Sequence, residues 1–433
     1  MRKIAWIIAA ALGLSLAACG GGGGSSNSSS TANTPTNTNT NSNTNTPLTV
    51  GTTAPGALAA DASAVPTAVG PGNTMSVTVT GTSLHNQPMV TIKLCTPGTT
   101  GTAACSTIPN VLVDTGSYGL RLVRSAIPDA TFNTLTADTV SGQPLAECAL
   151  FGSGYTWGTV RNAGLVLSGE IANTVPIQVI GDAALTTAAP SECQVGRAMA
   201  TASDIGANGI LGLGVSPNDC GSPCAVSALS THYYTYSGTP TKAPVLNQVT
   251  NPVTLFAQDN NGVILEMGQV GDMGSASAQG TLVFGIDTQA NNALAGTSAT
   301  LISTDINGDF TSTYNGVRQS NTFFDSGSTV MFFPDSTITR DFSSSYYVPT
   351  STVGRTITLS ATSPSSVTLG FNIANAQTLN ATSNNAFNDI GVYMTGQFDF
   401  GLPFFFGRHV YYGISGKSST GGGMGPYVAY TSS

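Results

Sequence analysis

Two short, nearly identical strings constrain this chain more than any other feature. Val-Asp-Thr-Gly-Ser occupies residues 113–117, and Phe-Asp-Ser-Gly-Ser occupies residues 324–328. Each string places an aspartate after a hydrophobic run and before glycine and hydroxyl residues, a pattern typical of a turn that points the carboxylate out of a strand end. Asp114 and Asp325 are 325 − 114 = 211 residues apart, which predicts two lobes that each bring one carboxylate to a shared cleft. In the alternative interpretation, each aspartate only opens an ordinary turn.

The part of the chain after the N-terminal tether is too long for one hydrophobic core. It suits two lobes, for which we predict residues 48–250 and 251–433. Alternating hydrophobic and polar residues indicate strands, for example at 75–80 and 90–94. Glycine, asparagine and proline interrupt such segments at short intervals, and no long segment has a helical period. We therefore predict an all-β fold of many short strands.

The N-terminus has the features of an export signal, which we place at residues 1–18. Arg2 and Lys3 form its charged start, and a short apolar run from 4 to 16 follows them. The string Leu-Ala-Ala-Cys that ends at Cys19 resembles the lipobox of bacterial lipoproteins. That resemblance implies cleavage before Cys19 and an anchor of several acyl chains, which is sufficient for stable membrane attachment. An ordinary signal peptide is the alternative.

Residues 19–47 consist mainly of glycine, serine, asparagine and threonine. Such a segment cannot bury a core, so we interpret it as a flexible tether between the lipid and the folded part. Gly20, rather than an aspartate, follows Cys19, and by resemblance to lipoprotein sorting rules this implies the outer membrane. We therefore expect a lipid-anchored protein of the bacterial cell envelope.

Six cysteines follow Cys19, and an even number in an exported chain indicates disulfides. Six cysteines allow 15 pairings. Their order along the chain suggests the pairs Cys95–Cys105, Cys148–Cys193 and Cys220–Cys224. A metal site is the alternative, and it is disfavoured because the three histidines are not at ligand spacing from the cysteines; they are His85, His232 and His409. We expect neither a metal nor another cofactor.

The charge of the chain excludes one class of partner. Charged residues make up 8% of the sequence, and the formal net charge is −8. Proteins that bind nucleic acid carry a basic surface, so we expect no nucleic-acid partner.

Five segments, in this order along the chain, resemble the pepsin-type aspartic peptidases. They are 110–117, 208–214, 280–287, 323–329 and 400–407. The first and fourth segments match the two aspartate loops, and the second, Asn-Gly-Ile-Leu-Gly-Leu-Gly, matches the string that threads under the first loop. This resemblance covers most of the folded part, and it implies two β-barrel-like lobes with a cleft between them.

The sequence is also identified as a member of a family of bacterial lipoproteins with a domain of unknown function. It is similar to that family at Val-Asp-Thr-Gly-Ser-Tyr-Gly-Leu-Arg (113–121), at Asp-Cys-Gly (219–221) and within 251–264. Membership in this family implies no activity, so the function has to be argued from the site.

The peptidase resemblance implies that Asp114 and Asp325 form a pair that shares a proton. One carboxylate would activate water, and the other carboxyl group would polarise a peptide carbonyl. The supporting residues would be Thr115, Gly116, Ser117, Ser326, Gly327 and Ser328. By resemblance, the first hydroxyl of each loop cross-braces the loops, the glycines let backbone amides approach the carboxylates, and the last hydroxyls bond the outer oxygens.

Two positions depart from the peptidase pattern. The string Phe-Gly-Ser-Gly-Tyr-Thr-Trp-Gly at 151–158 resembles the flap of that family, with Phe151 where a tyrosine is expected. Tyr155 and Trp157 are the nearby residues that could replace the lost hydroxyl. Arg121 stands where a tryptophan is common; it could point into the cleft, bind a substrate carboxylate, or lie on the surface at a strand end.

These inferences favour a lipid-anchored, monomeric endopeptidase that acts on a peptide or protein substrate. A non-catalytic lipoprotein that binds peptides or proteins on the same fold is the main alternative, and the altered flap motivates it. A glycoside hydrolase also uses two carboxylates, but aromatic residues for stacking sugars are sparse. A structural repeat protein would require short-period repeats, and the duplicated half is the repeat we find.

Overall fold

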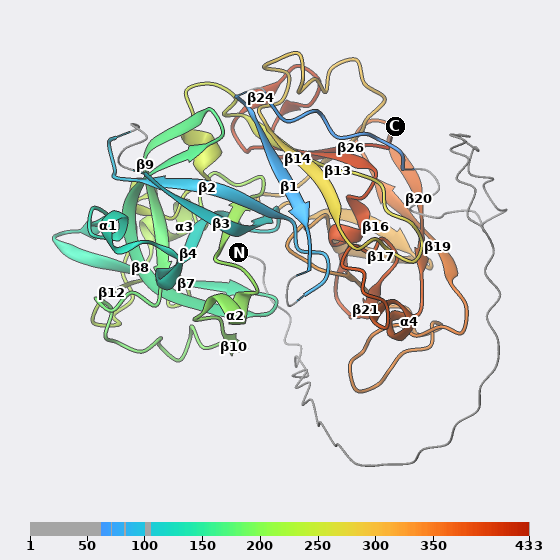
Figure 1. Ribbon diagram of the computed structural model, residues 1–433, viewed down its shortest axis with the longest axis horizontal. Helices are drawn as coiled ribbons and strands as arrows, with labels where there is room; N and C mark the ends of the chain where they lie inside the picture. The colour runs from blue at the N-terminus through green and yellow to red at the C-terminus, as the bar shows by residue number, and fades with distance from the viewer. Residues whose placement is uncertain (1–61, 71, 82–83, 100–104, 433) are drawn as a thin grey trace, which may run out of the picture.

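The computed structural model describes residues 62–70, 72–81, 84–99 and 105–432. The predicted signal, the tether and Cys19 lie outside these described residues. Strands dominate the described part and form two lobes that lie side by side (Figure 1). Within the same part of the chain, no helix is long and apolar enough to cross a membrane.

The first lobe is built from strands of the N-terminal half, among which β8 and β9 form a long hairpin. Its strands are β2 (Met89–Cys95), β3 (Cys105–Asp114), β4 (Tyr118–Val123), β5 (Thr136–Ala137), β6 (Thr139–Val140), β7 (Gln143–Phe151), β8 (Gly154–Leu167), β9 (Glu170–Ile180), β10 (Arg197–Ala198), β11 (Gly209–Leu213) and β12 (Tyr233–Thr235). Alternation along β2 buries Val90, Ile92 and Leu94 and exposes Thr91 and Lys93, as expected for a half-buried strand.

A set of strands joins the two lobes into one continuous sheet. These strands are β1 (Thr74–Val79), β13 (Gly262–Met267), β14 (Ala278–Phe284), β15 (Thr300–Ser303), β23 (Arg408–Gly413) and β26 (Tyr427–Thr431). β1 pairs along its whole length with β14 and touches β2 at one position. A strand from the N-terminal end of the folded part therefore lies in the sheet of the C-terminal half, across the expected boundary at residue 250.

The second lobe contains a separate seven-stranded sheet. Its strands are β16 (Phe310–Tyr314), β17 (Val317–Phe323), β18 (Met331–Phe333), β19 (Val353–Ser360), β20 (Ser366–Ile373), β21 (Gly391–Tyr393) and β22 (Phe398–Asp399), and the pair β24 (Ser418–Ser419) and β25 (Gly423–Met424) stands apart. The helices of both lobes are single turns: α1 (Asp129–Phe132), α2 (Ala202–Ile205), α3 (Ser222–Val226), α4 (Ala376–Asn380), η2 (Arg124–Ala126), η3 (Val245–Asn247), η4 (Pro252–Leu255) and η5 (Leu402–Phe404).

The two halves repeat one local arrangement around their aspartate strings. In the first half, β11 runs parallel to β3, which ends at Asp114, and antiparallel to β4, which follows the loop. In the second half, β22 runs parallel to β17, which leads into Asp325, and antiparallel to β18, which follows that loop. This duplication confirms the predicted bilobal, pepsin-like fold, because each half threads a strand beneath its own aspartate loop.

The core behind the second aspartate loop is aromatic. Phe324, which precedes Asp325, stacks on Phe404 with ring centroids 4.1 Å apart. The ring centroid of Phe400 lies 5.2 Å from that of Phe324. Truncating a buried phenylalanine to alanine typically costs about 3–5 kcal/mol, so this cluster fixes the loop firmly.

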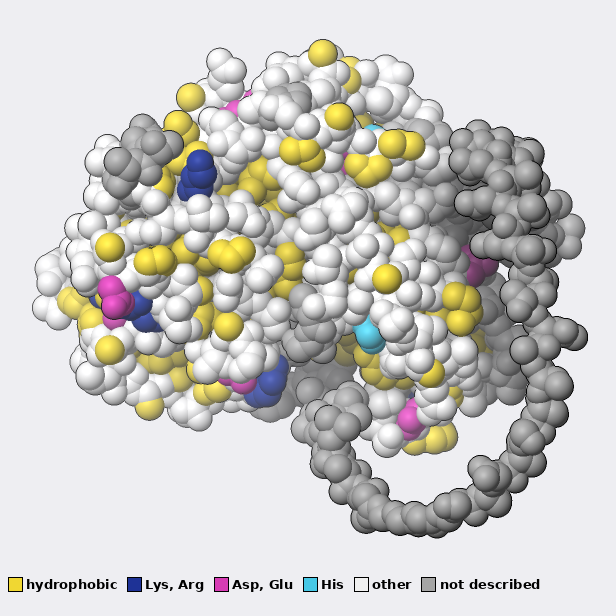
Figure 2. All heavy atoms as spheres, viewed as in Figure 1, with side chains coloured by type: hydrophobic (Ala, Val, Ile, Leu, Met, Phe, Trp, Pro, Cys, Tyr) yellow, Lys and Arg dark blue, Asp and Glu magenta, His cyan; other side chains and the backbone are white. Residues whose placement is uncertain are grey.

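Few charged side chains appear on the face shown in Figure 2, in keeping with the 8% of charged residues in the sequence.

Candidate active site

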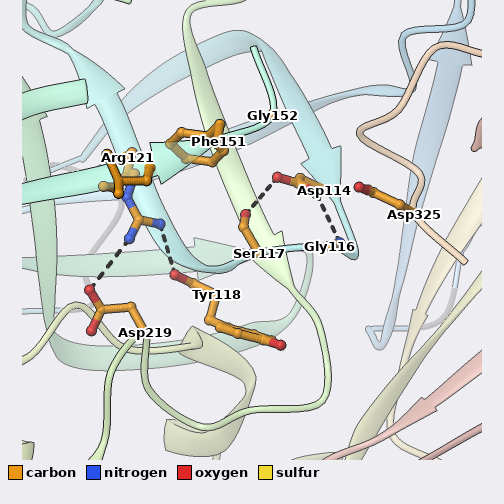
Figure 3. A pocket seen from close by; sticks show the side chains of 11 residues that line it. Asp114, Gly116, Ser117, Tyr118, Arg121, Phe151, Gly152, Asp219 and Asp325 are labelled. Carbon is orange, nitrogen blue, oxygen red and sulfur yellow. Dashed lines mark hydrogen bonds and ion pairs between the residues drawn. The ribbon is translucent and has the colours of Figure 1, made fainter. Parts of the chain in front are cut away.

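The two aspartate loops meet where the lobes join. Asp114 is the last residue of β3, and Asp325 follows β17 by two positions. Both residues line one pocket, and their carboxyl groups face each other (Figure 3). The carboxyl groups are hydrogen-bonded to one another. Residues 211 positions apart in the sequence are therefore brought into direct contact.

The first loop holds its carboxylate with two donors. The Gly116 N–H donates to Asp114 Oδ1 at 2.8 Å, and the Ser117 hydroxyl donates to Asp114 Oδ2 at 2.6 Å. A Cβ atom on Gly116 would lie 2.4 Å from Oδ2 of Asp325. Glycine is required here because the loop of one lobe touches the carboxylate of the other.

The second loop is built in the same way. The Gly327 N–H donates to Asp325 Oδ1 at 2.8 Å, and the Ser328 hydroxyl lies 3.2 Å from Asp325 Oδ2. A Cβ atom on Gly327 would lie 2.6 Å from Oδ1 of Asp114. The close approach is therefore reciprocal, and each glycine makes room for the aspartate of the opposite lobe.

Hydrogen bonds between the loops fix their relative position. The Thr115 N–H donates to Ser326 Oγ at 3.1 Å, and the Ser326 N–H donates to Thr115 Oγ1 at 3.0 Å. The Ser326 hydroxyl continues to the Val113 carbonyl at 2.7 Å. The Thr115 hydroxyl instead donates to the Tyr412 hydroxyl, which donates to the Phe324 carbonyl, each over 3.0 Å. The Thr115 hydroxyl thus reaches the backbone of the second loop through Tyr412, whereas the Ser326 hydroxyl bonds the backbone before the first loop directly.

The proximity of the two carboxyl groups changes their titration. Burial, the charge of Asp325 and the hydrogen bond between the two carboxyl groups raise the pKa of Asp114 from 3.8 to about 7, against the opposing hydrogen bonds from Ser117 and Gly116. Two carboxylates in contact share a proton and titrate as a pair. As the pH falls through about 7, Asp114 therefore takes up a proton that it can share with the carboxyl group of Asp325.

Arg121 is a buried residue rather than a surface residue, which contradicts one of its three predicted roles. It is 2% exposed, and its Nη2 lies 2.5 Å from Glu147 Oε1. Figure 3 shows its two other contacts: Nη2 lies 3.5 Å from Asp219 Oδ2, and Nη1 donates to the Tyr118 carbonyl. Although Arg121 lines the pocket, its guanidinium is already paired with two carboxylates of the protein. This pairing disfavours a clamp for a substrate carboxylate, and that role stays a prediction.

The Arg121 cluster joins three parts of the first lobe. Arg121 lies on β4 after the first aspartate loop, Glu147 lies on the flap strand β7, and Asp219 precedes α3. Burial lowers the pKa of Arg121, but the two carboxylates outweigh it and raise that pKa; burial also raises the pKa of Glu147 well above its usual range. Because Arg121 follows the aspartate loop and Glu147 lies on the flap strand, the cluster links the flap to that loop. Removing one member would leave an uncompensated buried charge.

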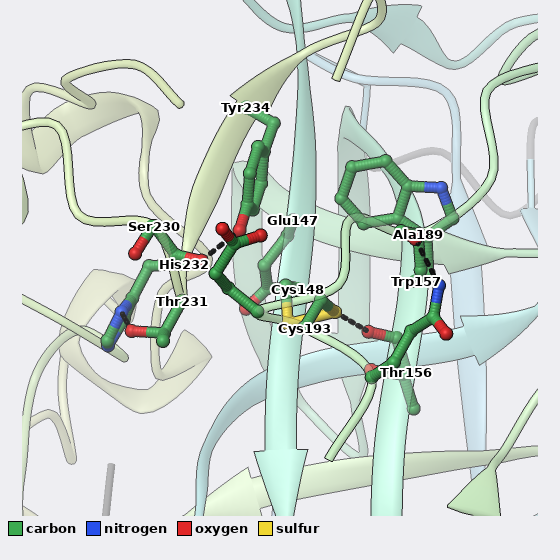
Figure 4. Close-up of a disulfide and its surroundings, with 12 residues drawn as sticks. Glu147, Cys148, Thr156, Trp157, Ala189, Cys193, Ser230, Thr231, His232 and Tyr234 are labelled. Carbon is green, nitrogen blue, oxygen red and sulfur yellow. Dashed lines mark hydrogen bonds between the residues drawn. A yellow bond between two sulfur atoms is a disulfide. The ribbon is translucent and has the colours of Figure 1, made fainter. Parts of the chain in front are cut away.

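The hairpin of β7 and β8 forms the flap over the pocket. Phe151 and Gly152 at its tip line the pocket, and the Phe151 ring centroid lies 5.6 Å from the Arg121 guanidinium carbon. Trp157 instead donates its ring N–H to the Thr187 carbonyl at 2.9 Å and packs beside the Cys148–Cys193 disulfide (Figure 4).

Tyr155 packs against the same cluster as Trp157, because residues two apart on a strand share a face. Neither Tyr155 nor Trp157 is among the described residues that line the pocket. The side chains of Tyr155 and Trp157 therefore lie away from the pocket lining, and their predicted replacement of the flap hydroxyl stays a prediction.

The structure contains the three disulfides suggested by the order of the cysteines: Cys95–Cys105, Cys148–Cys193 and Cys220–Cys224. It also places a ring nitrogen of His232 within 4.8 Å of the sulfur atoms of the last pair, a proximity that the sequence spacing did not indicate. Burial lowers the pKa of His232 to about 4, so the imidazole is neutral. As a disulfide, the cysteines do not offer the thiolates that zinc would need.

The comparisons with known proteins place the chain in a family. The family model described as "Protein of unknown function (DUF3443)" matches residues 70–430. The chain belongs to this family. No curated protein matches the sequence. Among solved structures, the chain is similar to the aspartic proteinase from Irpex lacteus, with 14% sequence identity, a TM-score of 0.48, and coverage of 82% of this chain and 97% of that chain.

Sequence reasoning missed four polar residues that complete the site. They are Glu147, Asp219, Tyr412 and Asp399, the last of which accepts a hydrogen bond from Ser328. A signal existed for Asp219, since the string at 219–221 resembles the family, although it assigned no role. Asp399 directly precedes the segment 400–407 and lies in a buried strand, where an acidic residue is itself unusual.

Proposed function

We propose that this protein is an aspartic endopeptidase in which Asp114 and Asp325 activate a water molecule against a peptide bond. The observation that carries this proposal is the hydrogen bond between the two carboxyl groups at the junction of the lobes. Each carboxyl group is also held by a glycine N–H from its own loop. The arrangement supports a chemistry that needs both groups at once.

In the proposed reaction, the ionised member of the pair takes a proton from a bound water molecule as the water oxygen attacks the peptide carbonyl carbon. The protonated member gives its proton to the carbonyl oxygen. The carboxyl group that took the water proton then gives it to the amine nitrogen as the C–N bond breaks, and the other carboxylate takes back the hydroxyl proton as the product carboxyl group forms. The residues of the pair need no covalent bond to the substrate, and the glycine and serine donors keep both carboxyl groups in place.

The separation of the carboxyl groups favours this chemistry over glycoside hydrolysis. Retaining glycosidases hold their two carboxyl groups about 5–5.5 Å apart, and inverting enzymes hold them about 6.5–9.5 Å apart. Here the two groups are within hydrogen-bonding distance of each other, which leaves no room for a sugar ring between them.

The pocket supports an apolar substrate residue beside the cleaved bond. Around the pair, the lining includes Tyr118, Ala149, Leu150 and Phe151, and the guanidinium of Arg121 is neutralised by its carboxylate partners. We therefore propose that the site prefers peptides with a hydrophobic side chain at this position. The sequence of residues 1–19 supports the further proposal that the enzyme is anchored by lipid at the bacterial cell envelope.

The test is a cleavage assay with protein that lacks the first 47 residues. Wild type should cleave an unfolded protein at a pH below about 7, where Asp114 is protonated, and Asp114→Asn and Asp325→Asn should each abolish cleavage. Asp341→Asn, which removes a partly exposed carboxylate from the second lobe, is the matched control and should cleave like wild type. Saturable peptide binding without cleavage, unchanged in both variants of the pair, would instead support a binding protein.

A further inference from the structure

Asp399 is a third buried carboxylate beside the proposed dyad. It ends β22 and lies opposite Phe323 of β17, two residues before Asp325. Asp399 is 2% exposed; its Oδ1 accepts the Gly401 N–H at 2.9 Å, and its Oδ2 accepts the Ser328 hydroxyl at 2.5 Å. A buried carboxylate costs free energy unless it is well hydrogen-bonded, so these bonds are essential to its placement.

The first lobe has a hydrocarbon side chain at the matching position. β11 runs parallel to β3 and places Ile210 opposite Leu112, two residues before Asp114. Ser117, the counterpart of Ser328, donates its hydroxyl to Asp114 Oδ2 at 2.6 Å. Asp399 therefore departs from the repeat of the two halves. The register of the strands shows that its counterpart in the first lobe is Ile210.

The hydroxyl of Ser328 stands between two carboxyl groups. Its oxygen lies 2.5 Å from Asp399 Oδ2 and 3.2 Å from Asp325 Oδ2. A serine hydroxyl has one proton to donate, and the shorter distance is the one expected for a bond from a hydroxyl to a carboxylate. The proton therefore goes to Asp399, whereas in the first lobe the corresponding proton goes to Asp114.

We propose that Asp399 is a positioning residue of the dyad, which draws the Ser328 hydroxyl away from Asp325 and so makes the two carboxyl groups of the pair unequal. The proposal rests on the proposed function of Asp114 and Asp325. β17 and β18 place Phe323 and Phe332 opposite Asp399, and the Ser328 hydroxyl links Asp399 to the titratable group of Asp325.

The direction of the effect follows from the hydrogen bond and the charge. A carboxylate that loses a donor, and that has a second carboxylate nearby, holds its proton more strongly. Asp399 therefore extends the pH range in which the pair keeps its shared proton, and it moves the alkaline limit of activity upward. Removing the acid should return the Ser328 hydroxyl to Asp325 and move that limit back.

The first experiment measures kcat/KM against pH for wild type, Asp399→Asn and Asp399→Ile, the second of which copies the residue of the first lobe. We expect the alkaline limb of both variants to move toward acid by about one pH unit, a roughly tenfold loss of activity above the limb. Asp341→Asn, at a partly exposed acid of the same lobe, removes the same charge and should leave the limb in place. If Asp399→Ile does not fold, Asp399→Asn, which keeps the shape and one acceptor, carries the test.

The second experiment repeats Asp399→Asn in a Ser328→Ala background. Since the effect passes through the hydroxyl, the substitution should move the limb by much less in this background than in wild type. An equal shift in both backgrounds would overturn the role of Ser328.

The third experiment follows the carboxyl carbon of Asp325 by NMR as a function of pH, with and without Asp399→Asn, and needs no turnover. A midpoint that falls in Asp399→Asn supports the inference even if no peptide is cleaved, in which case the proposed function fails and the positioning role stands. Cleavage by wild type with neither the limb nor the NMR midpoint moved by Asp399→Asn would overturn the inference and leave the proposed function intact.

Discussion

Replacing Gly116 with alanine tests the contact between the two lobes most simply. The added Cβ would lie 2.4 Å from Asp325 Oδ2, and ordinary van der Waals contact begins at 3.4 Å, so the two loops must separate by about 1 Å. Gly116 does not have a positive φ, so the substitution introduces no backbone strain of its own. A misplacement of about 1 Å in an active site can cost about 10²-fold in rate, and we expect at least that loss in kcat/KM.

The assay compares cleavage of an unfolded protein by wild type, Gly116→Ala and Gly271→Ala. Gly271 is exposed and does not have a positive φ, and a Cβ atom added to it would meet no described atom within 4 Å, so its variant is the matched control. Thermal unfolding should show that Gly116→Ala remains folded, because the loop can move while the sheets stay paired. Activity of Gly116→Ala within twofold of wild type would refute the claim that the loops are in contact at this point.

Three further variants have defined outcomes for stability. Burial and the charge of Asp272 raise the pKa of Asp389 from 3.8 to about 7. The stability that this group contributes is therefore fully present below about pH 4 and is lost as the pH rises through 7. In urea unfolding, the free energy of unfolding of Asp389→Asn should gain up to about 4 kcal/mol over that of wild type between pH 4 and pH 8. Replacing Cys148 and Cys193 together by alanine opens a loop of 45 residues and should lower the free energy of unfolding by about 4 kcal/mol; a change below about 1 kcal/mol would contradict the chain-entropy argument. Arg121→Met should cost about 3–5 kcal/mol in the same assay, because it leaves two buried carboxylates without their cation, and a neutral result would show that they are not ionised.

The parts of the site that could be predicted from the sequence are those written in local strings. A glycine and hydroxyl context within three residues holds each aspartate, so residues 113–117 and 324–328 predict both loops. The duplicated strings also predict two lobes, although β1 pairs with β14 across the expected boundary because a sheet partner is chosen in space rather than along the chain.

The remaining parts depend on contacts that no local pattern records. Arg121 meets Glu147 26 residues away, and the Thr115 hydroxyl meets Tyr412 297 residues away. Strand periodicity shows that Tyr155 and Trp157 share a face, but which face turns toward the pocket depends on how the hairpin packs. A sequence therefore indicates the chemistry of the loops more readily than the side chains that fix their position.

The titration of Asp114 tests the central claim most directly. The carboxyl carbon of Asp114 should titrate near pH 7 in wild type. In Asp325→Asn its midpoint should fall toward 3.8, because the charge of the second carboxyl group is gone, while burial keeps it above that value. A wild-type midpoint near 3.8, or the same midpoint in both proteins, would contradict a shared proton and with it the account of the two aspartate loops as one site.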